Sequence, residues 1–249
     1  MTRGGRGRER TTLDRLGAHT LEQPAAGYRF SMDSVLLAAF AAPADGPVAD
    51  LGAGCGVLAV LLAARGLAGP FLAVEIDELA AACCARNLER AGVAGAVLVH
   101  DLAQPHPEMK NGAFALVISN PPFGQPGQGR LPPDPARARA RHRLALDENH
   151  LWQRASRLLR AKGRLAFCWP PARLPRALAG LAAHRLAPRR LRLVHGRAHL
   201  PAKIALIEAV KDGGEELVVE APLVIYENEG QEYGPETAAI YRRLCGPLD

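Results

Sequence analysis

The sequence predicts an α/β fold with a Rossmann-like, mostly parallel sheet covered by helices. From Val48 to Pro170, short apolar runs alternate with longer stretches of helical pattern, which is typical of parallel strands joined by helical crossovers. The chain has 249 residues and is 48% hydrophobic, enough for one large domain with a buried core. We therefore expect one main domain with short additions at both ends.

The first three strands each begin a strand-and-helix unit. VADL (48–51) is a short apolar run that ends at a glycine-rich turn, and a helical stretch at 56–65 follows it. FLAVEI (71–76) is the second run, followed by a helical stretch at 77–91. AVLVH (96–100) is the third predicted strand.

The next two strands are separated by a long insertion. FALVIS (114–119) and GRLAFCW (163–169) are the strands, and helices are expected over 147–161 and 173–184. The insertion at 124–144 is rich in Gly, Pro and Arg. Connections longer than about 12 to 15 residues are usually functional or disordered.

The last part of the chain closes the sheet. Residues 189–197 and 202–213 have the pattern of an antiparallel pair, and the tail indicates one more strand and a short final helix. The predicted organisation is a disordered basic tail at 1–10, an N-terminal flap or helix packed on the core at 11–47, and the main domain at 48–249 with a C-terminal extension at about 214–249.

Composition excludes some classes of protein. No apolar run suited to a signal peptide follows the basic N-terminus, and no stretch of about 18 apolar residues is present. We expect a cytoplasmic protein without a membrane partner. The five cysteines have no zinc-ligand spacing, so we expect them to be reduced and structural, with no metal site.

Charge is distributed unevenly along the chain. Residues 130–203 hold 18 Lys and Arg but 3 Asp and Glu, a balance of +15, whereas 204–249 hold 3 and 10, a balance of −7. The basic segment favours a polyanionic partner, and nucleic acid fits better than a membrane because no basic segment has a strongly apolar opposite face. A solvated basic surface is the alternative.

Four polar residues fall at the predicted carboxyl ends of strands, where open α/β sheets bind ligands. They are Asp50, Glu75, Asp101 and Asn120. Taken singly, each of them is equally consistent with a turn former or a helix cap. Their common location makes them a candidate binding site.

The turn after the first strand, DLGAGCG, carries Gly52, Gly54 and Gly56, which allow close approach of a ligand to the backbone. Val57 stands where a dinucleotide fingerprint requires its third glycine, so a pyrophosphate is disfavoured. Asp50 suits an ammonium group instead.

Two further acidic residues indicate which other groups the ligand carries. Glu75 suits the two hydroxyls of a ribose, and Asp101 suits an adenine amino group. A ligand with an ammonium, a ribose and an adenine but no phosphate is S-adenosylmethionine.

In this order and spacing, DLGAGCG, VEID, HD and NPPF resemble the class I S-adenosylmethionine-dependent methyltransferases. The resemblance implies a seven-stranded sheet whose last two strands form an antiparallel hairpin. It also implies cofactor contacts at Asp50, Gly52, Gly54, Glu75 and Asp101.

The SNPPF corner at 119–123 explains how such an enzyme would act. An exocyclic amine is planar and weakly nucleophilic, and two acceptors, the Asn120 side-chain oxygen and the Pro121 carbonyl, would draw it toward tetrahedral geometry. Pro121 and Pro122 hold these acceptors rigid, and Phe123 offers a face for stacking, worth roughly 1 to 3 kcal/mol for a base. The structural alternative is a strand-ending turn with Phe123 in the core.

More distant segments resemble one methyltransferase family. GYRFSMDSVLLAAF (27–40), RHRLALDENHL, LVHGRAHLPAKIALIEAVKDG and LVIYENEGQEYGPETAAIYRR resemble the bacterial tRNA adenine-N-methyltransferases that modify valine tRNA beside its anticodon. The resemblance covers roughly residues 12–245. It implies that GYRFSMDS is a flap with Ser31 or Asp33 near the cofactor; a cap for a helix starting at Ser34 is an equal alternative.

The insertion offers phosphate contacts, because Arg137, Arg139 and Arg141 follow the catalytic corner. A solvated loop is again the alternative. A loop base also flips out more cheaply than a paired one. The other candidate functions are a release-factor glutamine methyltransferase, a ribosomal RNA base methyltransferase and a catalytically idle RNA-binding protein.

Overall fold

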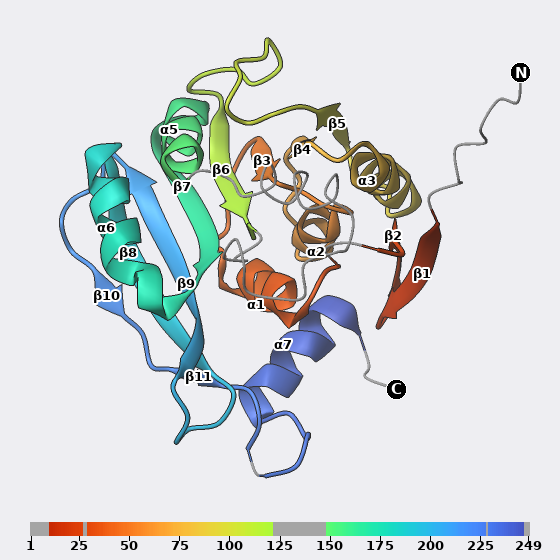
Figure 1. The fold of residues 1–249 in the computed structure, drawn as a ribbon, viewed down its shortest axis with the longest axis vertical. Helices are drawn as coiled ribbons and strands as arrows, with labels where there is room; N and C mark the ends of the chain where they lie inside the picture. The colour runs from red at the N-terminus through yellow and green to blue at the C-terminus, as the bar shows by residue number, and fades with distance from the viewer. Residues whose placement is uncertain (1–9, 27–28, 122–147, 228, 247–249) are drawn as a thin grey trace, which may run out of the picture.

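The computed structural model describes residues 10–26, 29–121, 148–227 and 229–246, and Figure 1 shows their arrangement. A central sheet runs through the molecule with helices on both faces. The strands of this sheet are β3 (Val48–Leu51), β4 (Phe71–Glu75), β5 (Gly95–Val99), β6 (Phe114–Ser119), β7 (Leu159–Trp169), β8 (Leu186–His195), β9 (Ala202–Lys211), β10 (Val218–Val219) and β11 (Leu223–Val224). The helices are α1 (Met32–Phe40), α2 (Val57–Ala64), α3 (Glu78–Arg90), α5 (Glu148–Leu158), α6 (Leu174–Ala183), α7 (Pro235–Cys245) and the 3₁₀ turn η1 (Pro171–Arg173).

The strand order within the described residues is β10-β8-β9-β7-β6-β3-β4-β5, with β11 also paired to β8. Strands β3 to β7 are parallel, and β9 is antiparallel to both β7 and β8. The seven long strands and the antiparallel last hairpin are as predicted. The tail adds two short strands, β10 and β11, instead of one.

Central strands are continuous apolar runs because both of their faces are covered. Every residue of β3, β4 and β6 is buried. Successive residues of β7 face opposite layers: Phe167 packs with α5 and α6, whereas Cys168 packs on the side of α1 and α2. The sheet thus divides two hydrophobic layers, and the helices α1, α2, α3 and α7 lie in one of them.

Local signals set the starts of individual helices. The Asp77 carboxylate accepts the Ala80 N–H at 2.8 Å, which caps α3, and Arg90 lies in the last turn of that helix. α1 begins at Met32, and Ser31 precedes it without capping it through its side chain. The sequence interpretation of a cap for a helix starting at Ser34 is therefore wrong by two residues.

The N-terminal segment contains a two-stranded sheet that the sequence reading missed. Strands β1 (Thr11–Leu16) and β2 (His19–Pro24) form an antiparallel hairpin against α3, on the right in Figure 1. Buried Asn87 of α3 holds it: the Glu22 N–H donates to its Oδ1 at 2.8 Å, and its Nδ2 donates to the Glu22 carbonyl at 2.7 Å. The same Nδ2 donates to the Cys55 carbonyl at 2.8 Å, so the hairpin is tied to the glycine turn.

Candidate functional site

The corner after β6 lies directly beside the turn after β3. The two strands are parallel neighbours, with Asp50 opposite Ile118. Beyond that pair, the buried Ser119 hydroxyl donates to the Leu51 carbonyl at 2.7 Å, which extends the connection to the very end of both strands. Asn120 is therefore positioned next to the glycines, as the common location of the strand ends predicts.

The glycine turn adopts a backbone that favours glycine. Gly52, Gly54 and Gly56 have φ of 76°, 56° and 81°. The Gly52 and Ala53 N–H groups both donate to the Val74 carbonyl, at 2.9 and 3.1 Å, so the turn folds back toward β4. A Cβ on Gly54 would meet no atom within 4 Å, which means that the space beside this glycine is open.

Glu75 connects the two turns. Its side chain is buried, and its Oε2 accepts the Gly54 N–H at 2.8 Å. Its Oε1 accepts the N–H groups of Ile76 and Asp77 at 2.8 and 2.9 Å. The carboxylate therefore already shapes the glycine turn before any ligand is considered.

Asp50 is a fully buried carboxyl group. Neither of its oxygens has a hydrogen-bond partner in the described part of the chain. Burial, with the charge of Glu75 adding to it, raises the pKa of Asp50 to about 8. Such a group favours a cationic partner, because a nearby positive charge would restore the ionised form.

Asn120 faces a cavity with walls from three segments. Phe30 and Ser34 of the N-terminal segment line it together with Asn120 and the glycine turn, at Gly52, Ala53, Gly54, Cys55, Val57 and Leu58. The Asn120 side chain is buried, and its Nδ2 donates to the Ser34 Oγ at 3.1 Å. The N-terminal segment therefore forms a wall of the site, but through Phe30 and Ser34, whereas Ser31 and Asp33 do not line the cavity.

Other predicted residues are not brought to this cavity. Asp101 lies two residues beyond β5, is exposed, and accepts the Ala103 N–H at 2.9 Å in its own turn. Pro121 is buried at the corner. The predicted residues Pro122, Phe123, Arg137, Arg139 and Arg141 lie outside the described residues.

Ser34 is the site residue that the sequence interpretation passed over. It lies in the first turn of α1, directly before the buried run Val35–Ala38. A polar residue on the buried side of an apolar helix was the available signal. In the prediction, Ser34 was only the first residue of a capped helix.

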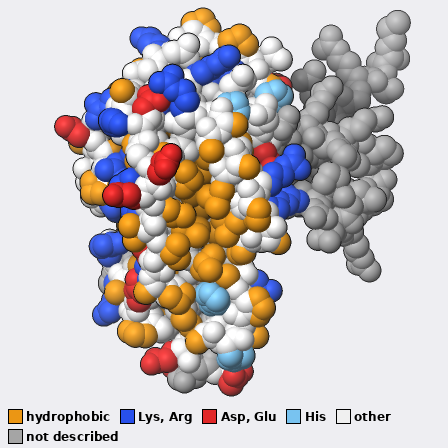
Figure 2. Space-filling view, turned by 90° about the vertical axis from the view of Figure 1, so that its left-hand side faces the viewer, with side chains coloured by type: hydrophobic (Ala, Val, Ile, Leu, Met, Phe, Trp, Pro, Cys, Tyr) orange, Lys and Arg blue, Asp and Glu red, His pale blue; other side chains and the backbone are white. Residues whose placement is uncertain are grey.

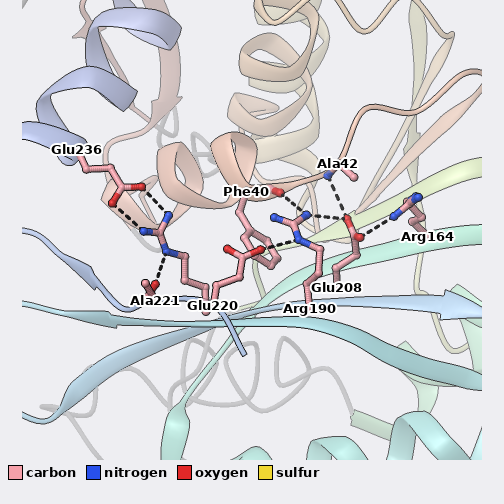
Figure 3. Close-up of polar contacts among 9 residues, drawn as sticks. Phe40, Ala42, Arg164, Arg190, Glu208, Glu220, Ala221 and Glu236 are labelled. Atoms are coloured by element: carbon pink, nitrogen blue, oxygen red, sulfur yellow. Dashed lines mark hydrogen bonds and ion pairs between the residues drawn. The ribbon is translucent and has the colours of Figure 1, made fainter. Parts of the chain in front are cut away.

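The uneven charge of the sequence has a structural explanation. Six arginines between 164 and 197 form ion pairs with six acidic residues between 208 and 236, so the basic segment and the acidic tail neutralise each other across the fold. Figure 3 shows the densest part, where buried Glu208 binds Arg164 and Arg190. Six of the 18 basic charges in this segment are therefore compensated by the acidic tail, which weakens charge segregation as evidence for a polyanionic partner.

The surface agrees with this pairing. On the side that carries α6, β8 and β10, Lys and Arg side chains lie among acidic and hydrophobic ones and do not form a continuous basic strip (Figure 2). Hydrophobic side chains cover the middle of this face. Within the described residues, this face therefore offers no continuous basic strip for a phosphate backbone.

The cysteines, the metal-binding side chains and the apolarity of the helices can be compared with the expectations from composition. The five cysteines are all free thiols in buried positions, and burial raises the pKa of Cys55 to about 12. Among the described residues, no three His, Cys, Asp or Glu side chains gather in a way that would hold a metal ion. In the same parts of the chain, every helix is too short or too polar to cross a bilayer.

Comparison with known families and proteins gives consistent matches. The family model of the methyltransferase small domain matches residues 31–133. The tRNA1(Val) (adenine(37)-N6)-methyltransferase of Porphyromonas gingivalis strain W83 is 33% identical over 197 residues, which are 76% of each chain. Proteins of the same name from Christiangramia forsetii and Tolumonas auensis are 31% and 30% identical, over 83% and 88% of this chain and 87% and 91% of theirs.

Solved structures share the fold. A predicted O-methyltransferase from Agrobacterium tumefaciens has a TM-score of 0.69 at 22% identity, covering 86% of this chain and 98% of its own. A 16S rRNA methyltransferase of T. thermophilus, in complex with AdoMet and guanosine, has a TM-score of 0.55 at 22% identity, over 81% of this chain and 50% of its own. The sheet described above is thus the sheet of known methyltransferases.

Proposed function

This chain belongs to the family of tRNA1(Val) (adenine(37)-N6)-methyltransferases, and on that basis we propose that it methylates the exocyclic amine of an adenine beside the anticodon of a valine tRNA. It is an S-adenosylmethionine-dependent N-methyltransferase. The observation that carries the proposal is Asn120, held at the end of β6 against the glycine turn.

The residues at the strand ends fit S-adenosylmethionine. Asp50 would hold the ammonium group, since its buried carboxyl has no hydrogen-bond partner among the described residues and a pKa raised to about 8. The open side of Gly54 leaves room where a side chain would obstruct the ligand. We assign backbone contacts to Gly52 and Gly54.

Glu75 and Asp101 would hold the nucleoside part. A carboxylate has about four acceptor sites, and three N–H groups already use Glu75, so it can accept one ribose hydroxyl without losing a bond. The second hydroxyl would have to share or replace a backbone donor. Asp101 is exposed and keeps free acceptor capacity for an adenine amine.

The chain's own contribution to methyl transfer is positioning. When bound, the cofactor would supply a sulfonium methyl group; the substrate amine would form the C–N bond as the S–C bond breaks, leaving a neutral thioether, and the N–H proton would pass to water. The Asn120 Oδ1 and the Pro121 carbonyl would accept hydrogen bonds from the two N–H groups of the amine, which favours the tetrahedral geometry that attack requires. Pro122 would keep the corner rigid, and Phe123 would stack on the base.

The proposal is tested by transfer of labelled methyl to bulk tRNA from a strain that lacks this gene. Wild type should label tRNA, and digestion should return the label as N6-methyladenosine. Asn120→Ala should lower the rate by about 10² to 10³-fold, because an acceptor at the reacting nitrogen is lost, with cofactor affinity nearly unchanged. Release factor and ribosomal RNA in parallel tubes serve as controls; label in either of these and not in tRNA would contradict the substrate proposal.

A further inference from the structure

Ser34 and Asn120 are 86 residues apart in sequence and meet at the wall of the cavity. The Asn120 Nδ2 donates to the Ser34 Oγ at 3.1 Å. Ser34 is 2% exposed and Asn120 is 5% exposed, so this hydrogen bond is largely shielded from bulk solvent. One partner belongs to the first turn of α1 and the other to the corner after β6.

A carboxamide has two chemically different ends. Its oxygen accepts hydrogen bonds, whereas its nitrogen donates two. An amine that approaches the Asn120 oxygen gains an acceptor, but the same amine before the Asn120 nitrogen would meet N–H groups. The reaction proposed above therefore depends on which way round the amide is held.

We propose that Ser34 is a positioning residue that holds the Asn120 amide with its nitrogen toward α1 and its oxygen toward the substrate amine. This inference rests on the proposed function. The nitrogen and the oxygen lie on opposite sides of the amide carbon, so a partner that engages the nitrogen fixes the oxygen away from α1. Ser34 acts through Asn120 and needs no contact with the substrate.

Positioning can be separated from packing by kinetics. Ser34→Ala removes one oxygen atom and leaves the helix intact, because alanine is a better helix former than serine. We expect kcat to fall about 10- to 100-fold, the range typical of small misplacements of a reacting group, with the cofactor dissociation constant unchanged. Ser34→Thr keeps the hydroxyl and should recover a large part of the rate.

A matched control is available in the same segment. Ser31→Ala removes a hydroxyl three residues earlier, at a position that does not line the cavity, and should leave kcat unchanged. Melting temperatures of both alanine variants serve as the check on folding. A loss of cofactor affinity as large as the loss of kcat in Ser34→Ala would overturn the inference.

The decisive experiment is a double-mutant cycle with Asn120→Asp, measured in single turnovers. An aspartate presents an oxygen whichever way round it is held, so its orientation needs no selection. Ser34→Ala should therefore cost much less in the Asn120→Asp background than in wild type. If Ser34→Ala lowered the single-turnover rate by the same factor in both backgrounds, Ser34 would merely fill space and the inference would be wrong.

A second measurement does not depend on activity. The chain has five asparagines, so protein labelled with ¹⁵N-asparagine gives few side-chain amide signals, and the Asn120→Asp variant assigns the one from Asn120. Ser34→Ala should move that signal, and Ser31→Ala should not. An unmoved signal would overturn the inference, whereas an inactive wild type would contradict only the proposed function.

Discussion

The Asp50 carboxyl group has a raised pKa that should link its protonation to cofactor binding. Its pKa is raised from 3.8 to about 8 by burial and by Glu75, so at pH 7 the carboxyl group of the ligand-free protein is largely protonated. A bound ammonium group would favour the ionised form. Cofactor binding near pH 7 should therefore release close to one proton.

This proton release can be measured by titration calorimetry in two buffers with different ionisation enthalpies. The binding enthalpy of wild type should depend on the buffer, and that of Asp50→Asn should not. We also expect Asp50→Asn to bind the cofactor more weakly. Buffer-independent heats for wild type would contradict the assignment of Asp50 to the ammonium group.

The raised pKa of Asp50 also determines how the stability of the ligand-free protein changes with pH. Between pH 4 and pH 8 the native carboxyl keeps a proton that the unfolded chain has lost, so the free energy of unfolding of the ligand-free protein falls as the pH rises through this window. Asp50→Asn removes this titration. Urea denaturation at pH 5 and pH 8 should show a smaller difference for the variant than for wild type.

At single residues, sequence reasoning located the strand ends but not the contacts across them. Asp50, Glu75 and Asn120 were predictable because each lies at or next to the carboxyl end of an apolar run in a parallel sheet. The contact between Ser34 and Asn120 was not, since it depends on how α1 lies against β6. Side chains 86 positions apart meet only through tertiary packing.

At the scale of elements, the C-terminal end of α1 is fixed by charged side chains from the sheet. Buried Glu208 of β9 accepts the Ala42 N–H at 3.1 Å and binds the Arg164 guanidinium at 2.7 Å. Arg190 donates to the Phe40 carbonyl at 3.2 Å and stacks over the Phe40 ring (Figure 3). The helix that carries Ser34 is thereby anchored to β7, β8 and β9.

Glu208→Gln should destabilise the protein by about 2 kcal/mol. It leaves two arginines without a buried counter-charge, and the partial exposure of both guanidinium groups keeps the cost below that of a fully buried pair. Glu236→Gln is the matched control, because the Glu236 side chain is half exposed and its ion pair with Arg192 should contribute less than about 1 kcal/mol. Urea denaturation measures both, and equal costs would disprove the anchoring role.

Elements with strong apolar periodicity were predicted well, and elements defined by long-range contacts were not. The strands β3 and β6 have the predicted bounds because burial on both faces leaves a continuous apolar run. The β1–β2 hairpin was missed, since few of its residues are buried and it is held by contacts with distant segments, among them Asn87 and Arg86 of α3. Its stabilising contacts are not local in sequence.

At the scale of the whole molecule, the charge pattern changes meaning once the chain is folded. The basic stretch at 130–203 and the acidic tail at 204–249 follow each other in the sequence, and the fold places them side by side in the sheet, where β8 pairs with β9, β10 and β11. The arginines of β8 are thus largely consumed by internal ion pairs. Sequence alone gives the number of charges but not their neighbours.

RNA binding should therefore depend on arginines outside this internal set. Replacing Arg137, Arg139 and Arg141 together with alanine should weaken tRNA binding and reduce the slope of log K against log salt concentration by roughly two to three, because each phosphate contact contributes about 0.7 to 0.9. The matched triple is Arg185, Arg189 and Arg192, each paired with an acidic side chain.

The salt slope of the matched triple should stay close to that of wild type, because an arginine that is already paired with a carboxylate displaces few counterions from the RNA on binding, so its loss changes the slope little. Filter binding at several salt concentrations compares the two triples at the same change of net charge. If both lowered the slope equally, binding would respond to net charge alone. If only the matched triple did, the phosphate-binding surface would lie along β8 after all, and its ion pairs would have to open to admit the tRNA.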